Sequence, residues 1–418
     1  MEKPAEELRL DNWRKQVQTI GFRGAVIALL KDHVSTIEDR NKLKTTIKRL
    51  RKYEPDLEII RELLKNPHWK STVEDIIDNL PHTNAEPEIL FVFRGGGNVP
   101  TIPATDEKKA YFSSGDTLYA IDGVTGQVAW RKKNPHKTWY PVFLEGEALY
   151  ATSGKTLVAL NKNTGNVLWV FRSEKHLTAP FSSNGQVYVG SHEGTLFSLN
   201  SRTGQRLWSF NVPKRIDIGN DSWNDLVFAV SEEGIVYGIR TNDGECLWQF
   251  RISSKVGSIP AVKDGLVVFG AEDHKIYALL ANSGQLLWEF TSGGKVYATP
   301  CIYDDVVYCG SRDRHLYALD IDTGEEIWRI RTLGYVSSPA VSGGMVYFSA
   351  QGRIYSVNAE SYKMRWCFPL GFSVATPPVI KGRRLYTGTQ GGQMLCLRLI
   401  ERLTEHTAAR VIKEFLGG

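Results

Sequence analysis

The sequence predicts an all-β propeller of eight blades, preceded by a small all-α bundle. Three observations lead to this fold class. Tryptophan recurs every 38–40 residues from Trp130 to Trp366, and a period of this length indicates a repeat architecture. Each interval holds about four short apolar runs divided by Gly, Asp and Asn, which is typical of the strands and turns of one blade. The first 82 residues lack this period and show helical spacing instead.

Residues 1–82 are expected to fold as an α-helical bundle. Apolar residues recur at helical spacing, for example Leu43, Ile47 and Leu50, which predicts amphipathic helices. Residues 83–87 would form a short polar linker, and residues 401–418 a C-terminal helix or tail. Helices are expected near residues 5–19, 22–33, 36–51, 56–65 and 70–80.

The segment 88–94 is expected to be the strand that closes the ring. Phe91 stands 39 residues before Trp130 and so occupies the tryptophan position of the repeat. The last unit, 375–399, supplies only about three strands of its own, whereas a blade needs four. Pairing between these two segments would complete an eighth blade and remove two open sheet edges. The propeller is therefore expected to span residues 88–400.

A phrase ending in tryptophan marks the fourth strand of each blade. Thr-Gly-Gln-Val-Ala-Trp at 125–130 is the first example, and its glycine is expected to adopt a positive φ in the preceding turn. The repeated aromatic residues are interpreted as blade-docking side chains, and the alternative is a stack around a cofactor. They are Phe91, Trp130, Trp169, Trp208, Trp248, Trp288, Trp328 and Trp366.

One position per blade, shortly before the inner strand, is expected at the mouth of the central channel. Lysine, arginine or histidine fills most of these positions and no acid does. Clustered like charges are unfavourable unless an anion compensates them. The pattern therefore predicts an acidic peptide, phosphorylated group or nucleotide as ligand, and a solvated rim is the alternative. The positions are Asn98, Lys137, His176, Lys214 or Arg215, Lys255, Lys295, Tyr335 and Phe372.

Blade four departs from the repeat with a group of acidic and amide residues. These residues could supply oxygen ligands to a hard cation, but a solvated irregular loop is the preferred interpretation. Neither a metal site nor a cofactor is expected in the chain. The residues are Asp217, Asn220, Asp221, Asn224 and Asp225.

Two oppositely charged groups stand on the expected helices of the N-terminal bundle. Opposite faces on one small domain would permit head-to-tail association with a like domain, and two solvated helix faces are the alternative. Nucleic-acid binding is not expected, because no recognition motif accompanies the basic group. The basic group is Lys42, Lys44, Lys48, Arg49, Arg51 and Lys52, and the acidic group is Glu58, Glu62, Glu74 and Asp78.

Composition limits the class of protein. The 418 residues carry a net charge of +5 and are 42% hydrophobic, which excludes a mostly disordered chain. No apolar run is long enough to predict a transmembrane helix, and residues 1–20 do not resemble a secretory signal. The five cysteines are scattered without a CxxC pair, which favours a reducing compartment. A cytoplasmic location without membrane contact is therefore expected.

The repeat resembles the β-propeller repeats of the pyrroloquinoline-quinone (PQQ) type. That family has a docking motif Ala-x-Asp/Asn-x-x-Thr-Gly-x-x-x-Trp, which residues 120–130 and 318–328 match. The resemblance implies the propeller fold but leaves activity open. The same motif serves quinoprotein dehydrogenases, the propeller lipoprotein of the outer-membrane β-barrel assembly machinery and other scaffolds.

The resemblance also provides two alternative functions. One is a PQQ-dependent oxidoreductase. In such enzymes the quinone lies in the channel between a tryptophan and a disulfide of adjacent cysteines, and this sequence has no such pair. The other is a scaffold like the barrel-assembly lipoprotein. A non-catalytic interaction protein is preferred to both.

The N-terminal segment resembles, in size and helix count, the death-fold superfamily and the death-like adaptor domains of bacterial conflict proteins. That resemblance implies homotypic contact with a partner protein that carries a like domain. Together the two parts predict a protein whose propeller binds a partner or ligand and whose helical domain transmits the event. A sensor or adaptor in bacterial defence or signalling fits this layout.

Overall fold

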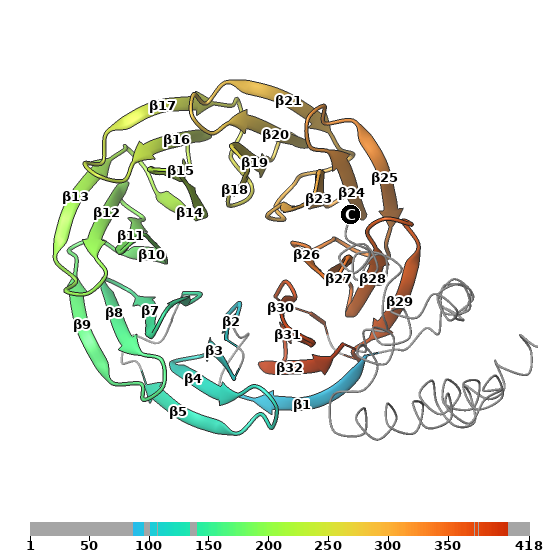
Figure 1. Ribbon diagram of the computed structural model, residues 1–418, viewed down its shortest axis with the longest axis horizontal. Helices are drawn as coiled ribbons and strands as arrows, with labels where there is room; N and C mark the ends of the chain where they lie inside the picture. The colour runs from blue at the N-terminus through green and yellow to red at the C-terminus, as the bar shows by residue number, and fades with distance from the viewer. Residues whose placement is uncertain are drawn as a thin grey trace, which may run out of the picture. The chain divides into compact units, whose positions relative to one another are not determined.

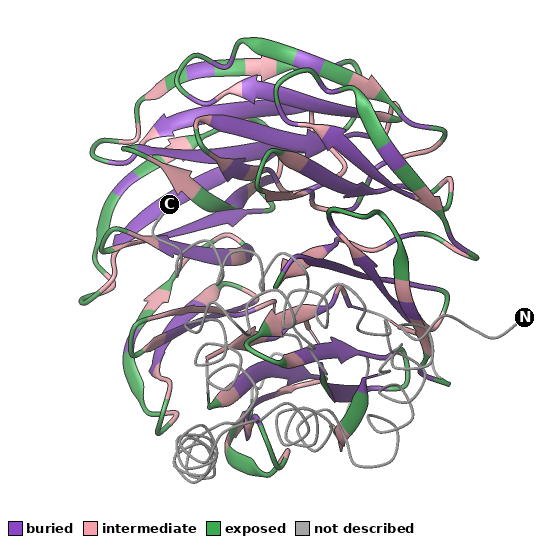
Figure 2. Ribbon diagram, turned by 45° about the vertical axis from the view of Figure 1, so that its right-hand side comes forward, coloured by how far each residue is buried: buried purple, intermediate pink, exposed green. Residues whose placement is uncertain are grey.

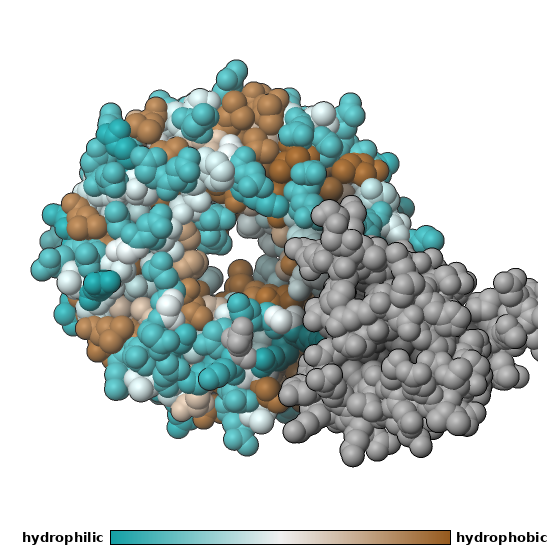
Figure 3. Space-filling model, in the orientation of Figure 1, coloured by the Kyte–Doolittle hydropathy of each residue, from teal (hydrophilic) through white to brown (hydrophobic). Residues whose placement is uncertain are grey.

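The computed structural model describes residues 87–95, 101–106, 108–133, 140–371, 373–374 and 376–399. These residues form eight four-stranded antiparallel sheets arranged as a ring (Figure 1). The ring surrounds an opening at its centre (Figure 3). The prediction of an all-β eight-bladed propeller is therefore confirmed. The predicted helical bundle, with both of its charged groups, and the C-terminal tail lie outside the described residues.

Each blade orders its strands from the centre of the ring outward. The innermost strands are β2 (Ala104–Thr105), β6 (Phe143–Glu145), β10 (Leu177–Ser183), β14 (Ile216–Trp223), β18 (Ala261–Lys263), β22 (Cys301–Tyr303), β26 (Ala340–Ser342) and β30 (Val379–Lys381). The second strands are β3 (Lys109–Ser114), β7 (Ala148–Ser153), β11 (Gln186–Ser191), β15 (Leu226–Ser231), β19 (Leu266–Gly270), β23 (Val306–Gly310), β27 (Met345–Ala350) and β31 (Arg384–Gly388).

The outer half of each blade consists of two longer strands. The third strands are β4 (Thr117–Asp122), β8 (Thr156–Asn161), β12 (Thr195–Asn200), β16 (Ile235–Arg240), β20 (Lys275–Leu280), β24 (His315–Asp320), β28 (Arg353–Asn358) and β32 (Gln393–Arg398). The outermost strands are β5 (Val128–Lys133), β9 (Val167–Arg172), β13 (Arg206–Asn211), β17 (Cys246–Arg251), β21 (Leu286–Thr291), β25 (Glu326–Arg331), β29 (Met364–Pro369) and β1 (Glu88–Arg94).

Burial explains why the strands differ in sequence pattern. The second and third strands of a blade are buried on both faces, because the neighbouring blades cover them (Figure 2). They therefore read as continuous apolar runs, as in β15. The outermost strands alternate instead. In β17, Trp248 is buried while Leu247 and Gln249 are exposed. None of the described segments is a helix with the length and hydropathy needed to span a membrane.

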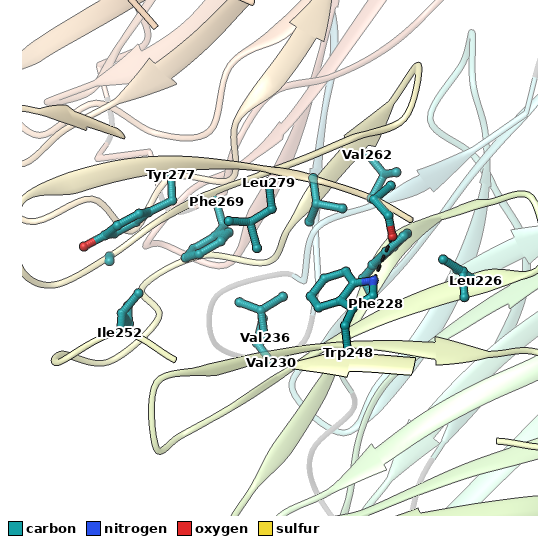
Figure 4. Close-up of a cluster of buried hydrophobic side chains, with 13 residues drawn as sticks. Leu226, Phe228, Val230, Val236, Trp248, Ile252, Val262, Phe269, Tyr277 and Leu279 are labelled. Carbon is teal, nitrogen blue, oxygen red and sulfur yellow. Dashed lines mark hydrogen bonds between the residues drawn. The ribbon is translucent and has the colours of Figure 1, made fainter. Parts of the chain in front are cut away.

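The tryptophan of each outermost strand packs against the next blade. Trp248 lies in a buried cluster with Phe228 of its own blade and Val262 and Leu279 of the following one (Figure 4). Its indole Nε1 donates a hydrogen bond of 2.8 Å to the carbonyl oxygen of Ala281. Trp130, Trp169, Trp208 and Trp288 make equivalent bonds of 2.7–2.9 Å to Lys162, Ser201, Thr241 and Ile321. Each bond joins two blades.

The glycine of the repeated phrase allows this close packing. Gly244 has a φ of 78°, and a Cβ there would lie 2.6 Å from Cε3 of Trp208. The positive φ and the close indole ring both favour glycine over any residue with a side chain. Blade seven is the exception, because Tyr362 occupies the glycine position with a φ of 61°. Its ring lies 5.6 Å from that of Trp328, whose buried Nε1 has no hydrogen-bond acceptor.

The ring closes between the first and last described strands. β1 pairs antiparallel with β32, and Phe91 lies opposite Cys396, so the predicted closure is confirmed. Phe91 packs over Gly126, whose added Cβ would lie 2.7 Å from the phenyl ring. Phenylalanine has no N–H to donate. The nearby carbonyl oxygen of Gly123 instead accepts a hydrogen bond of 3.2 Å from the hydroxyl of Tyr386.

The prediction of an irregular loop in blade four is wrong for most of its residues. Residues 216–223 form β14, which is paired with β15 at both ends. The register shifts between Ile218 and Ser222, so Gly219, Asn220 and Asp221 form a bulge in the strand. Because the pairing resumes beyond the bulge, Trp223 can still pack against the core of the next blade.

Candidate functional site

One face of the propeller carries two kinds of connection. The turn between the second and third strands and the connection from each outermost strand to the next innermost strand lie at the same end of the blade, because successive strands are antiparallel. Backbone hydrogen bonds join them, from the N–H of Glu232 to the carbonyl of Arg215 and from the N–H of Glu272 to that of Lys255. We call this ring of paired positions the mouth rim.

The mouth rim contains most of the predicted site residues that the structure describes. The same bonds identify His176, Lys255 and Lys295 as rim residues. They also select Arg215 over Lys214, and they place Ser373 in blade eight. Tyr335 occupies the corresponding position in the connection that leads to blade seven, just before Val336. Asn98, Lys137 and Phe372 lie outside the described residues.

Carboxylates from a second repeat position meet the lysines of the predicted basic arc. Lys255 forms an ion pair of 2.8 Å with Glu232 and Lys295 one of 2.7 Å with Glu272. Each glutamate stands on the turn of the preceding blade, so the acids come from a different repeat position and meet the lysines only in the ring. The hydrogen bond from Lys295, with a further one from Tyr297, lowers the pKa of Glu272.

Arg215 and His176 of the rim also have carboxylate neighbours. Arg215 makes a bidentate contact with Asp217, with distances of 2.9 and 3.0 Å. His176 lies 3.4 Å from Glu193. Each of these basic side chains therefore lies beside a carboxylate, and the anionic ligand expected from the sequence stays a prediction.

Blade six replaces the ion pair with a different contact. Its turn position holds Arg312 and the next connection holds Tyr335, where the preceding blades hold glutamate and lysine. The guanidinium carbon of Arg312 lies 4.2 Å from the ring centre of Tyr297 and 5.3 Å from that of Tyr335, which is cation–π geometry. Within the described residues, no carboxylate forms an ion pair with Arg312.

Two exposed side chains lie on the connection that follows this arginine. Tyr335 is 65% exposed and Leu333 is 62% exposed, the highest values among the large apolar side chains of the described residues. We call Tyr297, Arg312, Leu333 and Tyr335 the aromatic–arginine patch. Tyrosine and arginine are the residues that most often anchor protein interfaces.

Hydrogen bonds fix the backbone around the patch. Asp313 accepts bonds from the N–H of Gly293 at 2.8 Å, the N–H of His315 at 2.9 Å and the hydroxyl of Tyr317 at 2.6 Å. Burial alone would raise the pKa of Asp313, but these hydrogen bonds lower it overall. The hydroxyl of Thr332 donates within its own connection, to the carbonyl of Gly334 at 2.7 Å. The patch therefore stands on an ordered base.

The residues of this chain do not fit the quinone site that the resemblance implies. Five free cysteines lie in the described strands and none is adjacent to another in sequence. Cys301 and Cys309 lie on neighbouring strands, but Cys301 pairs in register with Tyr308. Burial raises the pKa of the Cys309 thiol. The repeated tryptophans pack between blades, on the outermost strands. In the described part of the chain, no group of three His, Cys, Asp or Glu side chains is placed to bind a metal.

Sequence reasoning found Tyr335 but missed Tyr297, Arg312 and Leu333. A signal for Arg312 was present, because the turn position reads Glu232, Glu272 and Arg312 in three successive blades. The change from glutamate to arginine coincides with the change from Lys295 to Tyr335. The two changes form a pair only when the turn of one blade is seen next to the connection of the following blade.

Solved structures with the same fold have low sequence identity to this chain. A computationally designed protein, Ika8, is 19% identical with a TM-score of 0.69, and the match covers 75% of this chain and all of that one. BamB from Moraxella catarrhalis is 16% identical with a TM-score of 0.62, over 75% of this chain and all of that one. Sqt1 from Saccharomyces cerevisiae is 11% identical with a TM-score of 0.65, and the match covers 76% of this chain and all of that one.

Family membership comes from the sequence itself. No curated protein matches the chain. A model of PQQ-type repeats, described as outer membrane protein assembly factor BamB, matches residues 67–232 and 232–335, which together are more than half of the chain. The chain therefore belongs to the PQQ-type propeller family that is described as outer membrane protein assembly factor BamB.

Proposed function

We propose that this chain is a non-catalytic interaction protein whose propeller docks a protein partner on the mouth rim. The observation that carries the proposal is the exposure of Leu333 and Tyr335 beside Arg312, on a backbone held by hydrogen bonds. Large exposed apolar side chains next to arginine are typical of protein-binding surfaces. The family supports a scaffold of this kind, since it is described as an assembly factor.

The experiment compares affinity capture by three forms of the full chain in lysate from its source. The wild type, a Leu333→Ser/Tyr335→Ala variant and an Ile327→Ser control are used as baits, and captured proteins are quantified by mass spectrometry. Ile327 is also exposed but lies on β25, in the outermost layer. We expect a partner captured by the wild type and the control to be lost from the double variant. Retention of every partner by the double variant would refute the mouth rim as the docking surface.

We further propose that residues 1–82 mediate homotypic contact, as an adaptor in bacterial defence or signalling. This rests on the sequence resemblance and on the two charged groups. Reversal of Lys48 and Arg49 to glutamate in the full chain should abolish self-association measured by sedimentation. Mixing with a Glu58→Lys/Glu62→Lys chain should restore it, because the charges are then complementary. Unchanged sedimentation of both variants would exclude the two charged groups as the contact.

The proposal includes the absence of a cofactor and action in the cytoplasm. Five free thiols in the described strands support a reducing compartment. Incubation with PQQ and Ca²⁺ should give neither a bound chromophore nor dye reduction. Fractionation of the source cells should recover the chain with cytoplasmic markers, and recovery with membranes would contradict this location.

A further inference from the structure

We infer that the aromatic–arginine patch binds a peptide segment in which a carboxylate stands next to an apolar side chain. The carboxylate would bind Arg312, and the apolar side chain would lie on Leu333 and Tyr335. This inference rests on the proposed function, because it names the chemistry of the partner that docks on the mouth rim.

The charge of the rim provides the first step. Glu232 with Lys255 and Glu272 with Lys295 are neutral pairs. At the next equivalent pair, Arg312 meets Tyr335, so one positive charge has no carboxylate partner among the described residues. The nearest acids are already used, since Glu272 binds Lys295 and Asp313 accepts three hydrogen bonds. An incoming anion is the complement of this position.

The geometry of the guanidinium provides the second step. Tyr297 and Tyr335 lie at cation–π distances from its central carbon. The N–H donors lie in the plane of the guanidinium. No described residue accepts a hydrogen bond from them. A planar acceptor with two oxygens can bind such donors in a bidentate way, as a carboxylate does.

The surroundings favour a carboxylate on a peptide over a phosphate. Phosphate groups are usually recognised by clusters of arginine or lysine, and here the neighbouring lysine, Lys295, is paired with Glu272. Leu333 and Tyr335 are exposed apolar side chains on the connection that runs beside the turn of Arg312 and Arg314. A segment that presents glutamate or aspartate next to leucine or phenylalanine would complement both parts.

The test uses synthetic nonapeptides with one Glu or Asp flanked by Leu or Phe in a Ser-Gly background. Their binding to the full chain is measured by fluorescence anisotropy. Controls are peptides with Gln or Asn in place of the acid, a phosphoserine peptide and free inorganic phosphate. We expect the acidic peptides to bind at least about tenfold more tightly than their amide counterparts, which corresponds to about 1.4 kcal/mol. Binding should weaken with added salt.

Two matched variants locate the site. Arg312→Gln should remove the preference for acid over amide. Lys162→Gln should leave this preference unchanged, because Lys162 is a paired cation in a turn between third and fourth strands, at the opposite end of its blade from the rim. Arg312→Lys should retain part of the preference, since it keeps the charge but loses the bidentate contact. Folding of each variant is checked by thermal unfolding.

The outcomes separate this inference from the proposed function. Equal binding of acid and amide peptides, full preference in Arg312→Gln, or binding of the phosphorylated peptide alone would overturn the inference. If that happens while Leu333→Ser/Tyr335→Ala still loses its captured partner, the docking surface stands and only its chemistry is wrong. If the double variant keeps every partner, the proposed function itself is wrong.

Discussion

At the scale of the residue, the joint between blades consists of one indole and one glycine. Trp208 covers Gly244 and donates its N–H to Thr241 of the same neighbouring blade. The glycine admits the ring and the carbonyl satisfies its polar atom, so a large aromatic surface is buried without an unpaired group. Trp328 has the ring contact without the hydrogen bond.

This difference predicts unequal effects of the same substitution. Trp248→Phe should remove the bond to Ala281 and leave that carbonyl without its partner. Trp328→Phe removes an N–H that has no acceptor. We therefore expect Trp248→Phe to lower the free energy of unfolding by about 1–2 kcal/mol more than Trp328→Phe. Urea unfolding followed by intrinsic fluorescence and circular dichroism measures both.

Phenylalanine is a suitable replacement in this comparison, since Phe91 already occupies the docking position of blade eight. Each variant loses a similar area of ring, so the difference between them isolates the hydrogen bond. Equal losses in the two variants would show that ring packing alone stabilises the joint.

At the scale of the element, the turns of the mouth rim are stabilised by buried acceptors. Asp313 joins its own turn to Gly293 of the preceding connection and to Tyr317 on β24. The complete set of hydrogen bonds to Asp313 requires its carboxylate to be ionised. The shape of blade six at the rim therefore depends on the charge of one side chain.

The lowered pKa of Asp313 predicts a pH dependence of stability. A carboxyl group with a lower pKa in the folded state than in the unfolded state stabilises the fold above its unfolded pKa. That contribution is lost as the pH falls below about 4. Asp313→Asn should thus be less stable than the wild type near neutral pH, and the gap should narrow at pH 3.

The control for this prediction is Asp322→Asn. Asp322 is exposed in the turn before β25, so its substitution should leave the pH profile close to that of the wild type. Thermal unfolding between pH 3 and 7 measures all three chains. A constant gap between Asp313→Asn and the wild type would contradict the assigned role of the carboxylate.

At the scale of the whole molecule, closure joins strands from the two ends of the repeat array. The pairing of β1 with β32 removes the sheet edges that an open array would expose. The docking at this seam differs from that of the other blades. Phe91 supplies the ring, and Tyr386 supplies the hydrogen bond to Gly123 that an indole supplies elsewhere.

Tyr386→Phe should therefore weaken the ring at its closure. The side chain is buried, and loss of its hydroxyl leaves the carbonyl of Gly123 with the weaker thiol donor of Cys396, at 3.8 Å. We expect a loss of about 1 kcal/mol in the free energy of unfolding. Hydrogen exchange should increase first in β1 and β32, because the seam between them and blade one is the part affected.

Tyr150→Phe is the matched control for the closure. Its hydroxyl donates to the carbonyl of Ser201, which also accepts the indole N–H of Trp169. The carbonyl of Ser201 keeps a strong indole donor when the hydroxyl is removed, whereas that of Gly123 keeps a weak thiol donor, so the loss should be smaller. A loss as large as that of Tyr386→Phe would show that the seam has no special dependence on its tyrosine.

The candidate site was less predictable than the fold, and Lys255 shows why. Its place on the rim follows from the repeat, since it precedes an inner strand by a fixed number of residues. Its partner Glu232 stands on another connection of the preceding blade. The local sequence around either residue does not predict that the two side chains are in contact. The sequence therefore could not show that Lys255 and Lys295 are paired with acids, or that Arg312 lies against two tyrosine rings.

The sequence by itself determined the number of blades and the way the ring closes. Both depend on a period of strands, turns and docking residues that is encoded locally, down to Phe91 at the position of a tryptophan. Only the tertiary structure decided which charges of the described rim form ion pairs and that Arg312 instead lies against two tyrosine rings. Side chains from different connections of neighbouring blades meet there, and their distances depend on how the sheets stack around the axis.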